Sequence, residues 1–317
     1  MREVTTADLS ALPAGGWRGW AGPLGATVLA AALRLPRLGT PHALVFDETY
    51  YAKDALSLLR YGYERKVIDG ADATLLGGDS DIFTKFPAYV VHPPLGKWVI
   101  AAGEGLFGAT PFGWRIMVAL VGIATVLVAG RVARRLTRSN TIGTLTALVV
   151  ALDGLHIAMS RTALLDTTLA FFVLCAFGLM IVDAQRPHDR LRWARLGMAV
   201  ALGLACATKW SGVYFAAAFL LLALSWDFGR RGDVAVWVRR DLLPALLVPV
   251  VMISVYLASW TGWLRSSTAW DRQWATDGSP LSRALRSLWH YHAEMLQFHT
   301  NLTATHNYRA NPLGWPL

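Results

Sequence analysis

A series of long apolar runs, separated by short polar segments, constrains this chain more than any other feature of its sequence. Seven runs approach or reach the roughly 20 residues that a helix needs to cross a bilayer. They lie near residues 20–36, 112–132, 141–159, 163–183, 194–208, 212–228 and 242–263. Hydrophobic residues make up 54% of the chain and charged residues 16%, a balance that soluble domains rarely have. We therefore predict an all-α fold, a polytopic bundle of about seven transmembrane helices.

The basic residues indicate how the bundle is oriented. The formal net charge is +9, but Lys and Arg lie in short connections between apolar runs, so a nucleic-acid partner is not expected. Three arginine-rich connections, at 131–138, 186–195 and 230–240, fall on one side of the membrane in this arrangement. The positive-inside rule assigns that side to the cytoplasm and predicts a multi-pass protein of the plasma membrane.

The remaining polar segments then fall on the extracytoplasmic side, where any chemistry is expected. The amphipathic stretch Leu95 to Gly108 must lie on the membrane as an interfacial helix, because a crossing there would move every arginine-rich connection outside. We predict a single membrane domain over 1–317, a first extracytoplasmic loop at 37–111 containing the catalytic acids, and a second extracytoplasmic segment at 264–317.

Two adjacent acids, Asp47 and Glu48, follow the first apolar run in the sequence Val-Phe-Asp-Glu-Thr-Tyr-Tyr. Ionisable residues at the membrane boundary are candidates for function. A carboxylate in such a water-poor place can act as a general base that takes the proton of an attacking hydroxyl. The alternative is structural, with Asp47 capping a helix that runs from Glu48 to Arg60.

Several cations are predicted to face the same compartment. In His92-Pro-Pro-Leu-Gly-Lys97, a helix beginning near Pro94 would offer its positive end to an anion beside His92 and Lys97. Lys209 lies between two later apolar runs. The alternative for both lysines is snorkelling, in which an aliphatic stem lies along apolar surface and only the ammonium group reaches water.

Arg161 and Asp166 stand where one predicted helix leaves the membrane and the next enters it. Charged residues at that depth are usually paired. The pair is either a structural salt bridge or a phosphate-binding arginine oriented by its aspartate.

Polar residues gather again near the end of the chain. His299 and His306 are seven residues apart, which places both on one face of a helix. No HExxH zinc motif is present, so most of these residues, Asn307 among them, are predicted to be polar interface residues. The Asp- and Gly-rich stretch 69–81 does not follow EF-hand spacing and is interpreted as a flexible loop.

Five motifs follow one another in order: Phe-Asp-Glu-Thr-Tyr-Tyr-Ala-Lys53, His-Pro-Pro-Leu-Gly-Lys97, Ser-Arg-Thr-Ala-Leu-Leu-Asp166, Thr-Lys-Trp-Ser-Gly212 and a His/Asn-rich run ending Asn-Pro-Leu-Gly-Trp-Pro316. Together they resemble the bacterial protein O-mannosyltransferase family over nearly the whole chain. The resemblance implies a GT-C membrane fold and transfer of mannose, with inversion, from a polyprenyl- or dolichyl-phosphate donor to Ser or Thr of exported proteins. The family normally continues with further spans after such a Trp-Pro segment, so this chain would lack them.

The resemblance also implies roles for individual residues. The family's acidic pair corresponds to Asp47 and Glu48, with Asp47 as the base, and Arg161 corresponds to the arginine associated with the donor phosphate. The remaining expected site residues are His92, Lys97 and Lys209 near the phosphate, and Asp166, His306 and Asn307 in support.

The chemistry of the residues agrees with these roles. A lipid phosphate is already a good leaving group, so catalysis needs positioning and cations rather than a proton donor. This scheme requires no metal, although the carboxylates and histidines leave a divalent metal as an alternative. The expected partners are a lipid-linked sugar donor, an exported Ser/Thr-containing protein, the membrane and the export machinery.

Two other functions remain open at this point. A related GT-C transferase would use the same donor with a glycolipid or cell-wall acceptor, and nothing in the sequence separates the two acceptor classes. A transporter or assembly scaffold is the non-enzymatic alternative. Transporters often show internal repeats and helices interrupted in mid-membrane, whereas the charges here gather at the ends of the runs.

Overall fold

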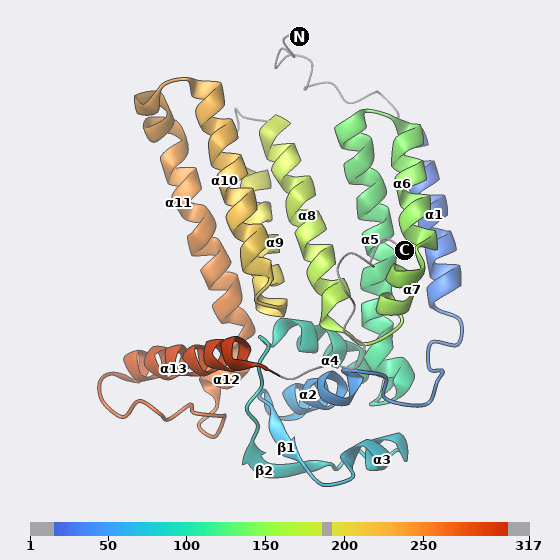
Figure 1. Ribbon diagram of the computed structural model, residues 1–317, viewed down its shortest axis with the longest axis vertical. Helices are drawn as coiled ribbons and strands as arrows, with labels where there is room; N and C mark the ends of the chain where they lie inside the picture. The colour runs from blue at the N-terminus through green and yellow to red at the C-terminus, as the bar shows by residue number, and fades with distance from the viewer. Residues whose placement is uncertain (1–15, 186–191, 304–317) are drawn as a thin grey trace.

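The computed structural model describes residues 16–185 and 192–303 and shows a bundle of long helices standing on a layer of shorter elements (Figure 1). The layer contains α2 (Glu48–Tyr61), β1 (Arg65–Val67), α3 (Ala71–Leu76), β2 (Phe83–Pro87), α4 (Leu95–Phe107), α12 (Thr261–Arg265) and α13 (Pro280–Asn301). The bundle contains α1 (Arg18–Arg34), α5 (Pro111–Thr137), α6 (Asn140–Leu152), α7 (Gly154–Ser160), α8 (Leu165–Gln185), α9 (Trp193–Thr208), α10 (Gly212–Arg231) and α11 (Val234–Ser259). The predicted all-α class is confirmed, with one short antiparallel hairpin, β1 with β2, added in the layer.

Fewer helices than predicted have the length and apolarity of a membrane span. Among the described residues four helices qualify, α5, α8, α10 and α11. The pair α6 and α7, bent by 62°, makes a fifth if it is one broken span. The break follows from Asp153, whose carboxylate accepts a hydrogen bond from His156 N and starts α7. The other two predicted runs do form bundle helices, but α1 has 17 residues and α9 has 16. Much of α9 is buried, so its apolar residues serve helix packing.

The arginine-rich connections were predicted to lie on one side of the membrane, and their described residues do lie at one end of the bundle. The end of α5, the start of α9 and the turn from α10 to α11, which carry the arginine-rich connections, lie opposite the layer (Figure 1). Buried there, Arg192 lies 2.7 Å from Asp183, 2.9 Å from Asp227 and 3.1 Å from Asp241. Buried charges near lipid are costly unless paired, so this cluster joins the ends of α8, α10 and α11 to the start of α9.

The stretch predicted to be an interfacial helix is α4, and it lies in the layer rather than in the bundle (Figure 1). Its buried residues Ile100 and Ala101 pack in one core cluster with Ala55 of α2 and Trp114 of α5. Close approach to α5 requires Gly103, because a Cβ there would overlap the carbonyl oxygen of Gly113. The predicted helix from Glu48 to Arg60 is α2, which ends at Gly62 with a left-handed φ of 79°. Within the stretch expected to be a flexible loop, residues 71–76 form α3.

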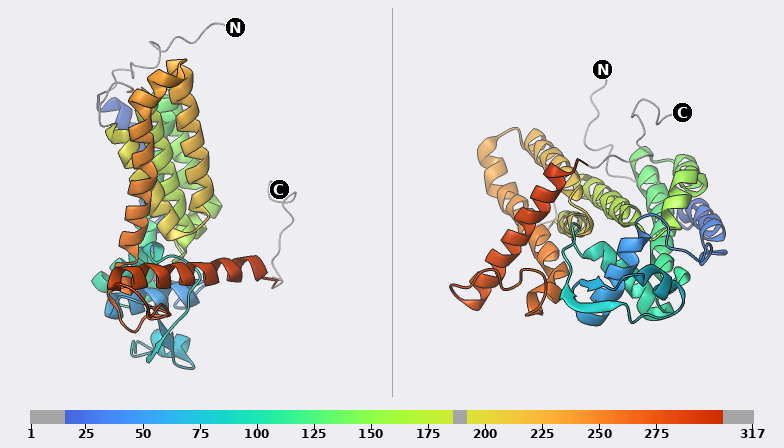
Figure 2. Two further views of the ribbon diagram at one scale, coloured as in Figure 1. Left: turned by 90° about the vertical axis from the view of Figure 1, so that its left-hand side faces the viewer. Right: turned by 60° about the horizontal axis from the view of Figure 1, so that its bottom comes forward.

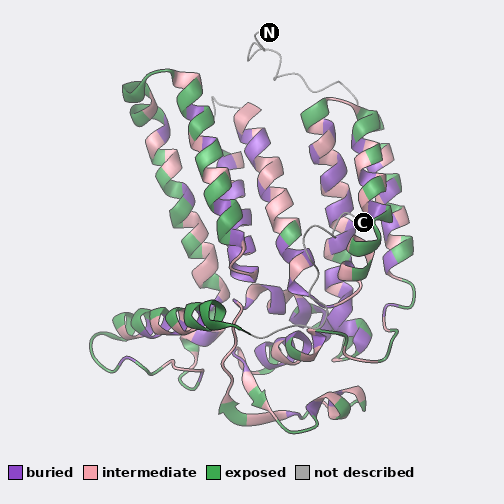
Figure 3. Cartoon of the chain, viewed as in Figure 1, coloured by how far each residue is buried: buried purple, intermediate pink, exposed green. Residues whose placement is uncertain are grey.

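Burial is uneven across the bundle. In the most apolar 18-residue stretch of α5, 56% is buried inside the protein. In the corresponding stretch of α11, only 6% is buried. Figure 3 shows the same contrast, with buried residues concentrated in α5, α2 and α4 and exposed ones along α10 and α11. The helix α13 lies across the end of the bundle, close to the lower end of α11 (Figure 2). The lower end of α5 packs against α2 and α4 in one core cluster, which joins the bundle to the layer.

Candidate functional site

A cavity of about 710 Å³ opens where α9 meets α10, between α11 and α13. Most of its lining is apolar or aromatic: Cys206, Trp210, Val213, Tyr214, Met252, Ile253, Tyr256 and Leu296. Its remaining side chains are polar: His92, Lys209, Ser211, His292, His299 and Thr300. A cavity with apolar walls and a cation suits a molecule that has both a hydrocarbon part and an anionic group.

A directed chain of hydrogen bonds fixes one wall of the cavity. His292 Nδ1 lies 2.7 Å from the carbonyl oxygen of Leu288, which can only accept, so Nδ1 carries the proton. His292 Nε2 then accepts from the Tyr256 hydroxyl at 2.7 Å, and that hydroxyl accepts from Trp210 Nε1 at 3.1 Å. Burial lowers the pKa of His292, so this imidazole is a neutral hydrogen-bonding group.

His92 belongs to the cavity, but not as a cation. Its ring stacks on His299 with centroids 5.6 Å apart. Burial lowers the pKa of His92 to about 4, and the positive charges of Lys209 and Lys97 contribute to the shift. His92 is therefore neutral near pH 7, and it can offer an anion a hydrogen bond rather than a charge.

This depressed pKa predicts a pH dependence of stability. Between the ordinary value of 6.5 and about 4, the unfolded chain binds a proton at His92 that the folded protein does not bind. The folded state therefore loses stability as the pH falls through this window. We expect His92→Gln to remove part of this loss when unfolding temperatures are compared at pH 7 and pH 5, with exposed His42→Gln as the matched control. An equal fall in the wild type and in His92→Gln would contradict the prediction.

Lys209 ends α9 and reaches the cavity from its polar side. Its ammonium group lies 2.9 Å from Asp166 Oδ1 in the first turn of α8. The side chains of Lys209 and Asp166 are 30% and 45% exposed, so an incoming anion can reach the lysine. Both residues were expected at the site, but the expected partner of Asp166 was Arg161.

The expected pairing of Arg161 with Asp166 is wrong. Arg161 donates instead to the carbonyl oxygens that end α1 and follow it, with distances of 2.7 Å to Arg34 O and 3.0 Å to Pro36 O. The last carbonyls of a helix have no partner within the helix, and a guanidinium group has several donors to offer them. Arg161 does not line the described cavity. Its association with a donor phosphate stays a prediction.

Lys97 was expected near the donor phosphate, but in the structure it is buried among acidic residues. Its side chain is 1% exposed and pairs with Glu64, and Asp54 lies 3.7 Å away. Snorkelling is thereby excluded as well, because the ammonium group does not reach water. Burial raises the pKa of Asp54, and the charge of Lys97 offsets part of that shift. In this structure Lys97 serves to neutralise acids between α2, α4 and the segment after α2.

The two adjacent acids have different surroundings. Glu48 is completely buried, and its oxygens accept from Arg115 at 2.8 and 2.7 Å and from the amides of Val45 and Ala163 at 2.8 Å each. Asp47 is half-buried, and its carboxylate does not cap α2, so the structural alternative does not describe it. The residue before Asp47 is Phe46, which has an uncommon left-handed φ of 54°. Glu48 therefore holds the start of α2, and Asp47 is the acid whose side chain is partly accessible.

Tyr51 connects Asp47 to the cavity. Its hydroxyl donates to Asp47 Oδ2 at 3.5 Å, and its ring centroid lies 6.1 Å from that of His92. Burial raises the pKa of Tyr51, and the negative charges of Asp47 and Asp166 contribute. Tyr51 thus lies between Asp47 and His92, and His92 is the one of the two that lines the cavity. Tyr51 was not among the predicted site residues, although its position four residues after Asp47 on a helix was a usable signal.

Two expected site residues, His306 and Asn307, lie outside the described residues. Among the residues that are described, Asp271, His290 and Glu294 could together hold a metal ion, but they do not line the cavity.

Comparison with known protein families identifies the chain. A family model described as dolichyl-phosphate-mannose-protein mannosyltransferase matches residues 25–264. The chain belongs to this family. The match includes the motifs that carry Asp47, His92, Arg161 and Lys209, and it ends just after α11.

Curated members of the mannosyltransferase family are similar over most of this chain. The polyprenol-phosphate-mannose–protein mannosyltransferases of Mycobacterium tuberculosis and Corynebacterium glutamicum are 37% and 32% identical to it, over 95% and 87% of its length. The alignments cover 62% and 58% of those two proteins. This family member therefore spans about three fifths of the length of the curated relatives it matches.

Solved structures show the same fold. The S. cerevisiae protein O-mannosyltransferase Pmt1–Pmt2 complex bound to the sugar donor has a TM-score of 0.60 at 19% identity, covering 95% of this chain and 38% of that one. ArnT from Cupriavidus metallidurans in the apo state has a TM-score of 0.57 at 23% identity, covering 83% of this chain and 45% of that one. The predicted GT-C type of membrane fold is thus confirmed for this mannosyltransferase family member.

Proposed function

We propose that this protein transfers mannose from a polyprenyl-phosphate mannose to Ser or Thr hydroxyls of exported proteins. The observation that carries the proposal is the position of Asp47, linked through Tyr51 to the polar end of a cavity with apolar walls. Family membership supports the reaction class, and the names of the mycobacterial and corynebacterial relatives support both the donor and the protein acceptor.

The proposed donor fits the chemistry of the cavity. The polyprenyl chain would lie along the apolar residues contributed by α10 and α11, among them Val213, Met252 and Ile253. The phosphate would lie at Lys209, where a charge-assisted hydrogen bond is available, with the neutral imidazole of His92 and the side chain of His299 as further hydrogen-bonding groups. Asp166 keeps the lysine at that end of the cavity.

The proposed reaction is a single displacement at the anomeric carbon of mannose. The acceptor oxygen forms a bond to that carbon while the bond from carbon to phosphate oxygen breaks, and the polyprenyl phosphate leaves with the electron pair. Asp47 takes the proton of the acceptor hydroxyl as general base. Attack opposite the leaving group inverts the configuration. Lys209 stabilises the charge that develops on the phosphate, and Glu48 with Arg115 positions the segment that carries Asp47.

The proposed site faces away from the cytoplasm. The arginine-rich connections lie at the other end of the bundle, and the positive-inside rule supports placing that end in the cytoplasm (Figure 1). A plasma-membrane location and contact with exported chains, including association with the export machinery, follow as parts of the same proposal.

The direct test is transfer of radiolabelled mannose from polyprenyl-phosphate mannose in membranes that carry this chain. The acceptor is a Ser/Thr-rich peptide, and the matched control peptide has Ala at every Ser and Thr. Label in the first peptide alone is the expected result. Label that appears only in lipid would favour the glycolipid alternative, and label in neither fraction would contradict the proposed activity of this chain.

Lys209→Met should weaken donor binding specifically. A charge-assisted hydrogen bond contributes about 1.5–3 kcal/mol, so we expect the KM for the lipid-phosphate donor to rise about 10- to 100-fold. The matched control is Lys85→Met, which removes an exposed lysine from β2. An unchanged donor KM in Lys209→Met would place the phosphate elsewhere and would return Arg161 to consideration.

A further inference from the structure

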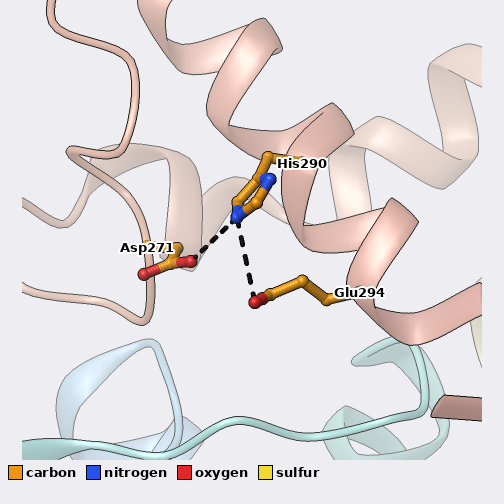
Figure 4. Close-up of side chains that lie close together, drawn as sticks. All are labelled: Asp271, His290 and Glu294. Carbon is orange, nitrogen blue, oxygen red and sulfur yellow. Dashed lines mark ion pairs between the residues drawn. The ribbon is translucent and has the colours of Figure 1, made fainter. Parts of the chain in front are cut away.

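A group of three side chains that can bind metal ions lies on the side of α13 away from the cavity. Asp271 belongs to the segment between α12 and α13, and His290 and Glu294 are one turn apart on α13 (Figure 4). His290 Nε2 lies 3.3 Å from Asp271 Oδ2 and 3.8 Å from Glu294 Oε1. One ligand atom from each residue lies within 4.8 Å of the other two. Both carboxylates therefore point at the same imidazole nitrogen.

Neighbouring tryptophans hold two of these side chains in place. The ring of Trp274 stacks on the imidazole of His290, with centroids 4.1 Å apart and planes 8° apart. Trp270 Nε1 donates to Glu294 Oε2 at 3.1 Å and leaves Oε1 toward His290. Hydrogen bonds of this kind to the second oxygen of a carboxylate are what orient the ligands of protein metal sites.

The net charge of these three side chains favours a bound cation. Within the described ranges, the ion pairs of Asp271 and Glu294 are made with His290 and not with Lys or Arg. The nearby Arg272 donates to the carbonyl oxygen of Leu264 instead. With a neutral imidazole the three side chains carry two negative charges, which a divalent ion would balance.

We propose that Asp271, His290 and Glu294 bind one divalent transition-metal ion, Zn²⁺ or Mn²⁺. One imidazole with two carboxylates favours these ions over Ca²⁺ and Mg²⁺, which prefer oxygen ligands alone. The side chain of His290 is 28% exposed and those of Asp271 and Glu294 are each 32% exposed, so water can complete the coordination. The ion fastens the segment between α12 and α13 to α13.

The proposed metal site is separate from the proposed transfer chemistry. Successive helix residues are 100° apart, so His290 and Glu294 face away from His292 and His299, which line the cavity. The ion would therefore act on the outer face of the helix that forms one cavity wall. Because its role is structural, the metal site is tested by binding and stability, and its failure would leave the proposed mannosyl transfer untouched.

The test uses the purified protein in detergent after treatment with a chelator. We expect Zn²⁺ and Mn²⁺ each to raise its unfolding temperature to a plateau, with one ion bound per chain by elemental mass spectrometry. Asp271→Asn and Glu294→Gln should lose this response. Trp270→Phe removes the hydrogen bond to Glu294 while keeping an aromatic ring beside Tyr89, and it should weaken metal binding by about 10- to 100-fold. The matched control is Asp277→Asn, which neutralises an exposed acid in the same segment.

Two further variants separate a metal site from the alternatives. His290→Lys replaces the imidazole with a permanent cation. If the three side chains form only an ion pair, this variant would be more stable than the wild type, and the wild type would not respond to metal. In His299→Gln a cavity histidine is removed, so loss of the metal response there would place the ion in the cavity. The proposal would be overturned by a more stable His290→Lys with no metal response in the wild type, or by loss of the metal response in His299→Gln. Absence of stoichiometric metal binding to the wild type would also overturn it.

Discussion

Asp47→Asn is expected to reduce mannosyl transfer by about 10²- to 10⁴-fold, the range that a general base contributes, without unfolding the protein. Asn keeps the shape of the side chain but cannot take a proton from the acceptor hydroxyl. The folded state should tolerate this change because Asp47 does not cap α2 and is only half-buried. The measurement is the initial rate of mannose transfer, with the donor KM determined in parallel.

A reduced rate with an unchanged donor KM is the specific signature, since the base acts on the acceptor rather than on the phosphate. Asp81→Asn is the matched control, because it neutralises an exposed acid in the same part of the chain, between α1 and α5. Wild-type turnover in Asp47→Asn would refute the assignment of the base. A loss in both variants would point instead to the net charge of the loop.

Glu48→Ala is expected to destabilise the protein by about 3–5 kcal/mol, the cost of removing one partner from a buried ion pair. Arg115 would remain buried with its charge uncompensated, and the amides of Val45 and Ala163 would lose their acceptor. We expect a lower unfolding temperature and less protein in the membrane. Transfer would be lost as a consequence of unfolding rather than of chemistry.

A double-mutant cycle distinguishes this structural role from a catalytic one. Replacing both partners with apolar residues, Glu48→Leu with Arg115→Met, should recover part of the stability lost in either single variant, because no unpaired charge remains. A Glu48→Ala protein that is as stable as the wild type but inactive would show that Glu48 takes part in the reaction itself.

The neighbouring acids illustrate how much of the site could be predicted. The motif around Asp47 and Glu48 correctly placed two acids at the start of a helix, because helix starts are local properties. The resemblance named Asp47 as the base but gave Glu48 no separate structural role. Only the tertiary structure shows that role, since the partners of Glu48 lie 67 residues away at Arg115 and 115 residues away at Ala163.

The predicted cations show the same limit. Lys209 reaches the cavity, whereas Lys97 is buried against Glu64 and Arg161 caps the end of α1. All three were expected near a phosphate, Lys97 because it lies at the start of a helix and Arg161 and Lys209 because each lies between two apolar runs. Which charges pair with one another depends on the elements that pack together, and periodicity within one segment carries no information about that choice.

The sequence by itself determined the all-helical membrane bundle, the concentration of arginines at one end and the placement of the expected site at the other. These properties follow from the number of consecutive apolar residues and from the cost of moving charge across lipid, both of which can be read along the chain. The tertiary structure alone decided how many helices are long enough to span, and which charged residues face the cavity. It also brought Asp271, His290 and Glu294 together. These features depend on long-range packing, in which each buried charge must find a partner on another element.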